Sequence, residues 1–282
     1  MESQQEFITH KPKSEFLQQF ISYYYFHTLT EKGVEANFRY YPGYKNALTI
    51  YKNSSVTYGQ GYSEVVPDSN SGYIFLYSGI QPEVRTAYIT GPFQKIGIVF
   101  HELGINHFID EDLNKLSSDP IEKSFSYFGD DLKQQCDAIY NKSDIDEKVD
   151  LLDAFFVNRY IGFDETLVKQ CVKEIIHSSE KQTVSNLAEK FQVSRKTLLR
   201  TFQKHLCCSV KEYIDVVQFR NVLYDYLLQK KDDSLTGVAL DNDYYDQSQF
   251  INHFKKFSGI NPTKFFKHVE HVGQEALFWT FH

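Results

Sequence analysis

Two segments in the C-terminal third of the chain carry side chains that can recognise base pairs in a DNA groove. They are Arg195, Lys196, Leu199 and Arg200 in the first segment, and Gln247, Ser248, Ile251 and Asn252 in the second. An arginine can donate two hydrogen bonds to guanine, and glutamine or asparagine can pair with adenine. Leucine or isoleucine can contact the methyl group of thymine. We therefore expect these residues to contact bases.

Three lysines stand beside the same segments, namely Lys204, Lys255 and Lys256. Their positions later in each segment suit contacts with the DNA backbone, which fix the orientation of a protein on the duplex without reading its sequence. We expect these lysines to bind phosphate groups.

Each segment has the features of a short helix that follows a tight turn. Ser194 and Asp246 stand at the expected N-caps, because their side-chain oxygens can accept hydrogen bonds from the free amides of the next turn. Apolar residues four positions apart form one face of each helix. They are Leu198 and Phe202 in the first segment, and Phe250 and Phe254 in the second. A short alanine-containing helix precedes each turn, so both segments are predicted to be helix-turn-helix units.

A long helix is predicted between the two units. Ser209 and Glu212 form a Ser-x-x-Glu capping box, and the helix continues to about residue 228. Twenty residues of helix measure about 30 Å, which is close to the ~34 Å between successive major grooves on one face of DNA. Such a helix can hold two recognition helices at adjacent grooves. Gly259 is predicted to end the second unit, and Pro262 to start a last short helix.

The N-terminal part of the chain shows a different pattern, which is typical of a small β-sandwich or barrel. Short β-like runs separated by turn residues occur at residues 37–41, 47–51, 73–77, 84–89 and 95–100. Helical signals follow at residues 103–109, 131–140 and 146–161. Of the 20 tyrosines, 15 lie before residue 161, where they can either fill a β core or line a ligand pocket.

Charge is distributed unevenly along the chain, whose net charge is −7. Residues 183–270 contain 13 Lys and Arg against 10 Asp and Glu, whereas the remainder contains 17 against 27. The basic excess therefore lies with the predicted DNA-binding units, and phosphate binding needs only a local basic patch. No apolar run approaches the ~20 residues that span a bilayer, and the first ten residues lack the apolar core of a signal peptide. Four cysteines without metal spacing indicate reduced thiols, so a cytoplasmic location is expected.

The C-terminal residues resemble the AraC/XylS family of bacterial transcription regulators over about 100 residues. The resemblance rests on the order and spacing of Leu187-Ala188, Ser194-Arg195, Leu198, Arg200, Phe202, Val238-Ala239, residues 244–250 and residues 254–262. It implies an α+β chain with a cupin-like β-barrel or sandwich with helices at residues 1–162, which serves sensing and dimerisation. Residues 163–282 are then an all-α DNA-binding domain of two helix-turn-helix motifs joined by a linker helix. Asp164 is predicted to cap the first helix of this domain.

In this family the exposed starts of both recognition helices enter major grooves, which agrees with the base-reading residues named above. Three positions depart from the family pattern. Gln192 and Asp243 stand in the two turns where glycine is usual, and Gln218 replaces a frequent basic residue in the linker helix. Asp can adopt the left-handed conformation of such a turn at some cost. Gln218, together with Asp241, Asp243 and Asp246 near the second unit, implies weaker phosphate binding there.

The resemblance also implies partners. They are double-stranded DNA, a small-molecule effector in the N-terminal domain, RNA polymerase and a second copy of the chain, with no membrane contact. One alternative is a dimeric DNA-binding protein that works without a ligand.

A second alternative is a cupin-type enzyme fused to a DNA-binding domain. Cupin enzymes hold a metal with a His-x-His pair, a carboxylate and another histidine, and no His-x-His occurs here. His101, Glu102 and His107 come closest, but they lack the histidine spacing of zincins. No nucleophile elbow, glycine-rich phosphate loop or Walker pattern occurs either. We therefore expect no catalytic residue, no metal and no cofactor.

Overall fold

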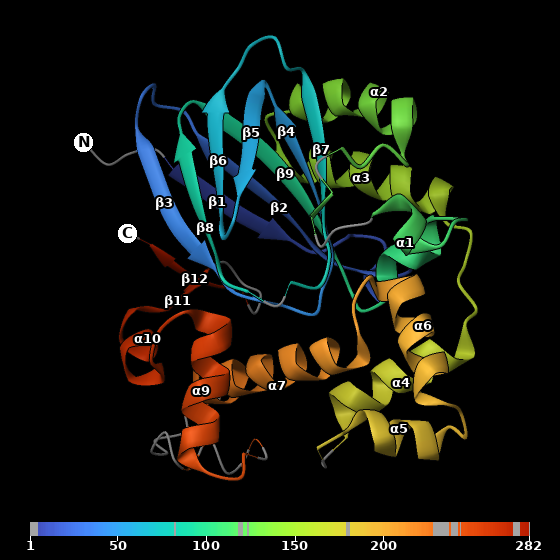
Figure 1. Ribbon diagram of the computed structural model, residues 1–282. Helices are drawn as coiled ribbons and strands as arrows, with labels where there is room; N and C mark the ends of the chain where they lie inside the picture. Colours follow the sequence, from blue (N-terminus) through green and yellow to red (C-terminus); the bar gives the residue numbers. More distant parts are fainter. Residues whose placement is uncertain are drawn as a thin grey trace.

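The computed structural model consists of a β-sandwich and a group of helices that lies along one end of it (Figure 1). The structure describes residues 5–81, 83–117, 121–122, 124–178, 181–227, 237, 242, 244–272 and 277–281. Strands dominate the chain up to residue 100, and helices dominate it from residue 129 to residue 268. The predicted α+β class is therefore confirmed.

Two six-stranded sheets form the sandwich. The first consists, in spatial order, of β1 (Gln5–His10), β2 (Ile21–Leu29), β9 (Phe93–Phe100), β4 (Ala47–Lys52), β7 (Tyr73–Ser78) and β10 (Ile121–Glu122). The second consists of β11 (Glu270–Val272), β12 (Leu277–Phe281), β3 (Glu35–Tyr40), β8 (Arg85–Thr90), β6 (Tyr62–Pro67) and β5 (Ser54–Gly59). Strands β6 and β8 pair in parallel, whereas the other pairs are antiparallel. The sheets do not close into a barrel, so the sandwich is the correct form.

All five predicted β runs are confirmed as strands, with ends that agree to within two residues. They correspond to β3, β4, β7, β8 and β9. The hairpin of β5 and β6 was not predicted, because its residues are largely polar and alternate weakly. Such a strand is stabilised mainly by packing against its neighbours in the sheet, and the β-propensity of its own residues does not show that packing.

The C-terminal end of the chain completes the second sheet. Strand β12 pairs with β3, so that Trp279 lies opposite Tyr40 and Phe281 lies opposite Phe38. Strand β11 pairs in turn with β12. The N-terminal strand β1 lies in the other sheet. Residues 163–282 are therefore not all helical as predicted, because their last strands belong to the sandwich, and the helices from α4 (Thr166–His177) to α10 (Pro262–His268) are joined to the sandwich part at both ends (Figure 1).

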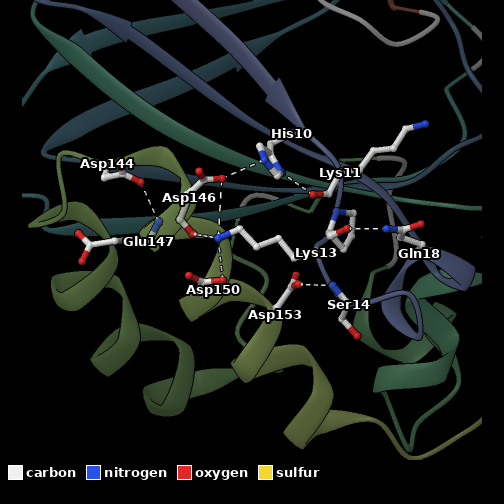
Figure 2. A network of polar contacts seen from close by, with 11 residues as sticks. His10, Lys11, Lys13, Ser14, Gln18, Asp144, Asp146, Glu147, Asp150 and Asp153 are labelled. Carbon is white, nitrogen blue, oxygen red and sulfur yellow. Dashed lines mark hydrogen bonds and ion pairs between the residues drawn. The ribbon is translucent and has the colours of Figure 1, made fainter.

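Two helices, α2 (Gly129–Tyr140) and α3 (Ile145–Arg159), cover the first sheet and share its apolar core. Figure 2 shows how the segment after β1 is fastened to α3. The ammonium of Lys13 lies 2.9 Å from the carboxylate of Asp150. The carboxylate of Asp153 accepts hydrogen bonds from the amide of Ser14 and from the hydroxyl of Tyr24, both at 2.8 Å. The buried charge of Asp153 is therefore compensated by two donors.

Helices from the C-terminal part of the chain share a second apolar core. They are α4 (Thr166–His177), α5 (Val184–Lys190), α6 (Arg195–Leu206), α7 (Val210–Leu227), α9 (Gln247–Ser258) and α10 (Pro262–His268). The predicted apolar faces are confirmed, because Leu198, Phe202, Phe250 and Phe254 are all buried in this core. Tyr41 and Leu103 of the sandwich belong to the same core, so apolar contacts join the two parts of the chain.

Hydrogen bonds at the helix ends confirm most predicted caps. Ser194 accepts from the amide of Thr197 at 3.0 Å, and Asp246 accepts from the amide of Gln249 at 2.7 Å. Ser209 and Glu212 bond reciprocally to each other's amides, as a capping box requires. Gly259 ends α9 with φ 76°, and Pro262 begins α10.

One predicted cap is wrong. The residue that precedes α4 is Glu165 rather than Asp164, and its side chain makes no capping hydrogen bond. The carboxylate of Glu165 lies instead 3.3 Å from the ammonium of Lys204. Helix α4 thus begins one residue later than predicted, and the carboxylate of the residue before it pairs with Lys204 instead of capping the helix. The first helix of the second helix-turn-helix unit and Asp243 lie outside the described residues.

Candidate nucleic-acid interface and ligand cavity

The start of α6 presents the first set of predicted base-reading residues to solvent. Arg195, Lys196, Leu199 and Arg200 are all exposed. Leucine 199 is 38% exposed although it is a large apolar residue, which leaves its side chain available for a thymine methyl group. The turn before α6 closes with Gln192 at φ 53°, where the family pattern has glycine. The turn therefore keeps its left-handed geometry without glycine.

The start of α9 presents the second set. Gln247, Ser248 and Asn252 are exposed, as are the predicted phosphate-binding residues Lys255 and Lys256. Ile251 is half-buried and packs partly against the helical core, so only part of its side chain can face a ligand.

Tyr245 is a further candidate that the sequence did not single out. It is 90% exposed and directly precedes the N-cap of α9, and its amide donates to the side chain of Gln249 at 2.8 Å. The sequence could not identify it, because sequence alone does not tell which of Tyr244 and Tyr245 is buried. The structure shows that Tyr245 is the exposed ring beside the predicted base-reading residues.

The linker helix sets the separation of the two recognition helices. Helix α7 has 18 residues, or about 27 Å, and α6 and α9 stand at its opposite ends (Figure 1). Both recognition helices contact the sandwich with their C-terminal ends. The side chain of Asn106 donates to the carbonyl of His205 at 3.2 Å, and Gly259 lies against Val84. The exposed starts of α6 and α9 consequently point away from the sandwich.

Lys204 is placed differently from the other predicted DNA contacts. It is half-buried, and its ammonium lies 3.3 Å from Asp112 and 3.3 Å from Glu165. These two carboxylates and their hydrogen bonds oppose the effect of burial and raise the pKa of Lys204. The nearby thiol of Cys207 donates to the carbonyl of Ser117 in the sandwich. The structure therefore shows Lys204 engaged at a contact between the two parts of the chain.

A cavity of about 400 Å³ lies between the two sheets of the sandwich. Both walls are rich in tyrosines, and α7 of the helical part closes one end. The tyrosines are Tyr23, Tyr25, Tyr40, Tyr41, Tyr44, Tyr51, Tyr58 and Tyr224. The volume is within the range of small-molecule sites, roughly 300–1,000 Å³. The sequence left open whether the tyrosines fill a β core or line a pocket, and these eight line a cavity.

Lys95 lies in the wall of this cavity on β9 and is 6% exposed. Its ammonium lies 5.4 Å from the ring centre of Phe38, 5.6 Å from that of Tyr25 and 5.7 Å from that of Tyr51. Burial lowers the pKa of Lys95 to about 7, because an ammonium is solvated less well there than in water. Aromatic faces recover part of that loss through cation–π attraction.

Gly97 explains why the ring of Tyr25 can lie along the cavity wall. The two residues are paired across β9 and β2, and a Cβ on Gly97 would collide with the ring of Tyr25. The hydroxyl of Tyr25 is 3.0 Å from that of Thr49, which fixes the ring from its other end. Glycine is therefore needed here for a close approach of a side chain to the backbone.

Two more cations line the cavity near α7. Arg220 belongs to α7, and Lys45 lies in the loop after β3, where it donates to the hydroxyl of Ser22 at 2.8 Å. Arg220 interacts electrostatically with Tyr23 and Tyr44. The sequence predicted none of these cavity residues. Side chains alternate between the two faces of a strand, so Lys95 lies on the same face of β9 as Val99. A lysine is nevertheless usually predicted to be exposed, because lysines are rarely buried.

The part of the chain that the structure describes contains no group of three or more His, Cys, Asp and Glu side chains placed to bind a metal. No described helix is both long enough and apolar enough to cross a bilayer.

Residues 187–268 match the family model described as "Helix-turn-helix domain". This part of the chain is thus a helix-turn-helix domain, which agrees with the resemblance noted in its sequence.

Two curated proteins match this part of the chain. The Msm operon regulatory protein of Streptococcus mutans is 34% identical over 101 residues, which are 35% of this chain and 36% of that protein. An uncharacterized HTH-type transcriptional regulator of Haemophilus influenzae is 27% identical over 86 residues, which are 30% of this chain and 28% of that protein. The chain therefore matches only about a third of the length of these relatives.

The chain also has matches among solved structures, at low TM-scores. ToxT of Vibrio cholerae with a bound unsaturated fatty acid is 12% identical, with a TM-score of 0.44, over 89% of this chain and 96% of that one. The C-terminal domain of AraT, a response regulator from Geobacillus stearothermophilus, is 22% identical, with a TM-score of 0.34, over 36% of this chain and 85% of that one.

Proposed function

We propose that the protein is a sequence-specific DNA-binding regulator of transcription whose two recognition helices enter adjacent major grooves. The observation that carries this proposal is the exposure of the starts of α6 and α9 at opposite ends of α7. The length of α7, about 27 Å, supports it, since successive major grooves on one face lie ~34 Å apart and the side chains add reach.

In this proposal the exposed side chains have separate tasks. Arg200 pairs with guanine, Gln247 or Asn252 pairs with adenine, and Leu199 and Ile251 contact thymine methyl groups. Arg195, Lys196 and Ser248 complete the two contact surfaces. Lys204, Lys255 and Lys256 bind phosphates, Lys204 only after it leaves its present carboxylate partners.

The cavity supports control by a small molecule. We propose that an effector binds there and that residues 1–162 serve sensing and dimerisation, while residues 163–282 bind DNA. Helix α7 belongs to the second region and lines the cavity through Arg220 and Tyr224. A ligand can therefore bias the arrangement of the recognition helices directly. RNA polymerase and a second copy of the chain are the proposed protein partners, the cytoplasm is the proposed location, and the proposal needs no catalysis.

Gel-shift titration of the full chain against genomic fragments tests the DNA-binding proposal. Unlabelled random DNA is added as a competitor. The expected result is that a small subset of fragments stays bound at about a 10³-fold excess of competitor, because specific sites bind typically 10³-fold or more tightly than random DNA. Equal loss of all fragments would contradict sequence-specific binding.

A further inference from the structure

We propose that the cavity binds an elongated organic dianion, such as a dicarboxylate with an apolar body, between Lys95 in the sandwich and Arg220 on α7. This inference rests on the proposed function only for its regulatory meaning. The binding itself follows from the cavity, its charges and its shape. The ligand class is one that the sequence motifs do not indicate.

Charge is the first argument. Among the described residues that line the cavity, three are basic and none is Asp or Glu. They are Lys45, Lys95 and Arg220. A partly desolvated space disfavours the charged forms of these groups, and an anionic ligand would stabilise those forms. An acidic residue, Glu102, lies near the cavity but does not line it. The pKa of Tyr44 is raised, chiefly by burial and then by the negative charge of Glu102.

The separation of the cations is the second argument. Arg220 interacts with Tyr23, which lies opposite Val99 in the pairing of β2 with β9. Lys95 lies four residues earlier on β9, a distance of about 13 Å along a strand. Lys95 and the side of the wall next to Arg220 are thus separated along β9, and a molecule with an anionic group at each end suits that separation.

The wall between the cations is the third argument. Aromatic rings, including those of Tyr25 and Tyr51, line it, together with Thr49 and Leu76. Flat aromatic faces contact methylene groups or an aromatic ring equally well, so the body of the ligand is expected to be apolar. The charged ends and apolar middle of the cavity thus match a molecule with the same order of groups.

The regulatory consequence comes from the position of Arg220. A dianion that reaches Lys95 at one end and Arg220 at the other connects the sandwich with the helix that holds α6 and α9 apart. Its binding would favour the arrangement in which α7 closes the cavity, and by linkage the same arrangement of α7 would favour the ligand.

Isothermal titration of the full chain, without DNA, tests the ligand class. The probes are decanedioate, decanoate and 1,10-decanediol, which share a body and differ only in charged ends. We expect decanedioate to bind at least tenfold more tightly than decanoate, and the diol to bind more weakly still. The same order is expected for 2,6-naphthalenedicarboxylate and 2-naphthoate. Equal binding within a series, or no binding of either dicarboxylate at millimolar concentration, would overturn the proposal.

Variants then locate the two ends. Lys95→Met should reduce the affinity for decanedioate at least tenfold and leave decanoate within twofold, whereas Arg220→Gln should weaken both. Lys52→Gln is the matched control, because Lys52 neighbours Tyr51 on β4 but faces the ring of Tyr140 on α2. A dicarboxylate affinity that is unchanged in Lys95→Met, or equally reduced in Lys52→Gln, would contradict the assignment. Since no DNA is present, failure here would leave the DNA-binding proposal standing.

Discussion

The ammonium of Lys204 on α6 lies 3.3 Å from the carboxylate of Asp112, the residue that precedes α1 (Leu113–Leu116) in the sandwich part. Lys204 is also one of the cations proposed to bind DNA phosphates. In the proposed function, a carboxylate within the chain and a phosphate of the DNA compete for this one charge. Contact between the sandwich and α6 would then oppose DNA binding, and movement of the sandwich away from α6 would release Lys204.

Removal of the charge of Asp112 should strengthen DNA binding. We expect Asp112→Asn to lower the dissociation constant about 1.5- to 5-fold, the equivalent of the ~0.2–1 kcal/mol of an exposed ion pair. Gel-shift titration measures it. Asp131→Asn is the control, because Asp131 forms an ion pair with Arg159 that does not involve α6. An affinity of Asp112→Asn no higher than that of the control would show that the pair does not compete with DNA.

Arg200→Ala should affect specific DNA much more than random DNA. Loss of a bidentate contact with guanine costs about 1–3 kcal/mol at the cognate site and relaxes the preference at one base position. Competition between a cognate fragment and its single-base variants measures both effects. Equal losses on cognate and random DNA would remove Arg200 from the base-reading residues.

Lys255→Ala should instead weaken all DNA sequences alike. The exposed ammonium of Lys255 is expected to replace one condensed counterion, so its loss should reduce the slope of log affinity against log salt by about one. Titrations at two salt concentrations on cognate and random DNA provide the measurement. A selective loss on cognate DNA, with an unchanged slope, would mean that Lys255 reads a base.

Lys95→Met should raise the stability of the protein at neutral pH. The pKa of Lys95 is about 7 in the folded chain and near 10.5 when unfolded, so the unfolded state binds more protons between these values. The free energy of unfolding of the wild type should therefore rise with pH from about 7 to 10.5, and this contribution should be missing in the variant. We expect a difference on the order of 4 kcal/mol at pH 7.5 that shrinks to about 1 kcal/mol at pH 10.

Urea unfolding of both proteins between pH 7.5 and pH 10 checks this expectation. In the folded protein, the other titratable groups around Lys95 do not change their charge between pH 7.5 and pH 10. His27 has a pKa well below its usual value, and Tyr25 and Tyr51 have raised pKa values, all chiefly through burial. A constant difference across the window would show that Lys95 keeps the same charge in both states.

The recognition helices could be predicted because their signals are local. The cap at Ser194, the apolar pair Leu198 and Phe202, and the capping box at Ser209 each depend on residues within one or two turns. The cavity could not be predicted in the same way. Its wall brings together strands that are far apart in the chain, and a buried lysine such as Lys95 runs against the usual exposure of its residue type.

The pairing of β12 with β3 was missed for a related reason. It joins Phe281 to Phe38 across almost the whole chain, and a strand of five residues carries no local sign of its partner. The position of Lys204 is similar, since its carboxylate partner Asp112 comes from a distant segment. Contacts of this kind depend on tertiary packing, which sequence patterns report only indirectly.

Selection of bound sequences from a random DNA library with the full chain tests the central claim most directly. If α6 and α9 enter adjacent major grooves, the selected DNA will contain two short conserved blocks about 10 bp apart, centre to centre. The block read by α6 should be the stronger one and should lose one position in Arg200→Ala. Enrichment of a single block, or of no common sequence, would contradict the proposal that both helices read DNA from the two ends of α7.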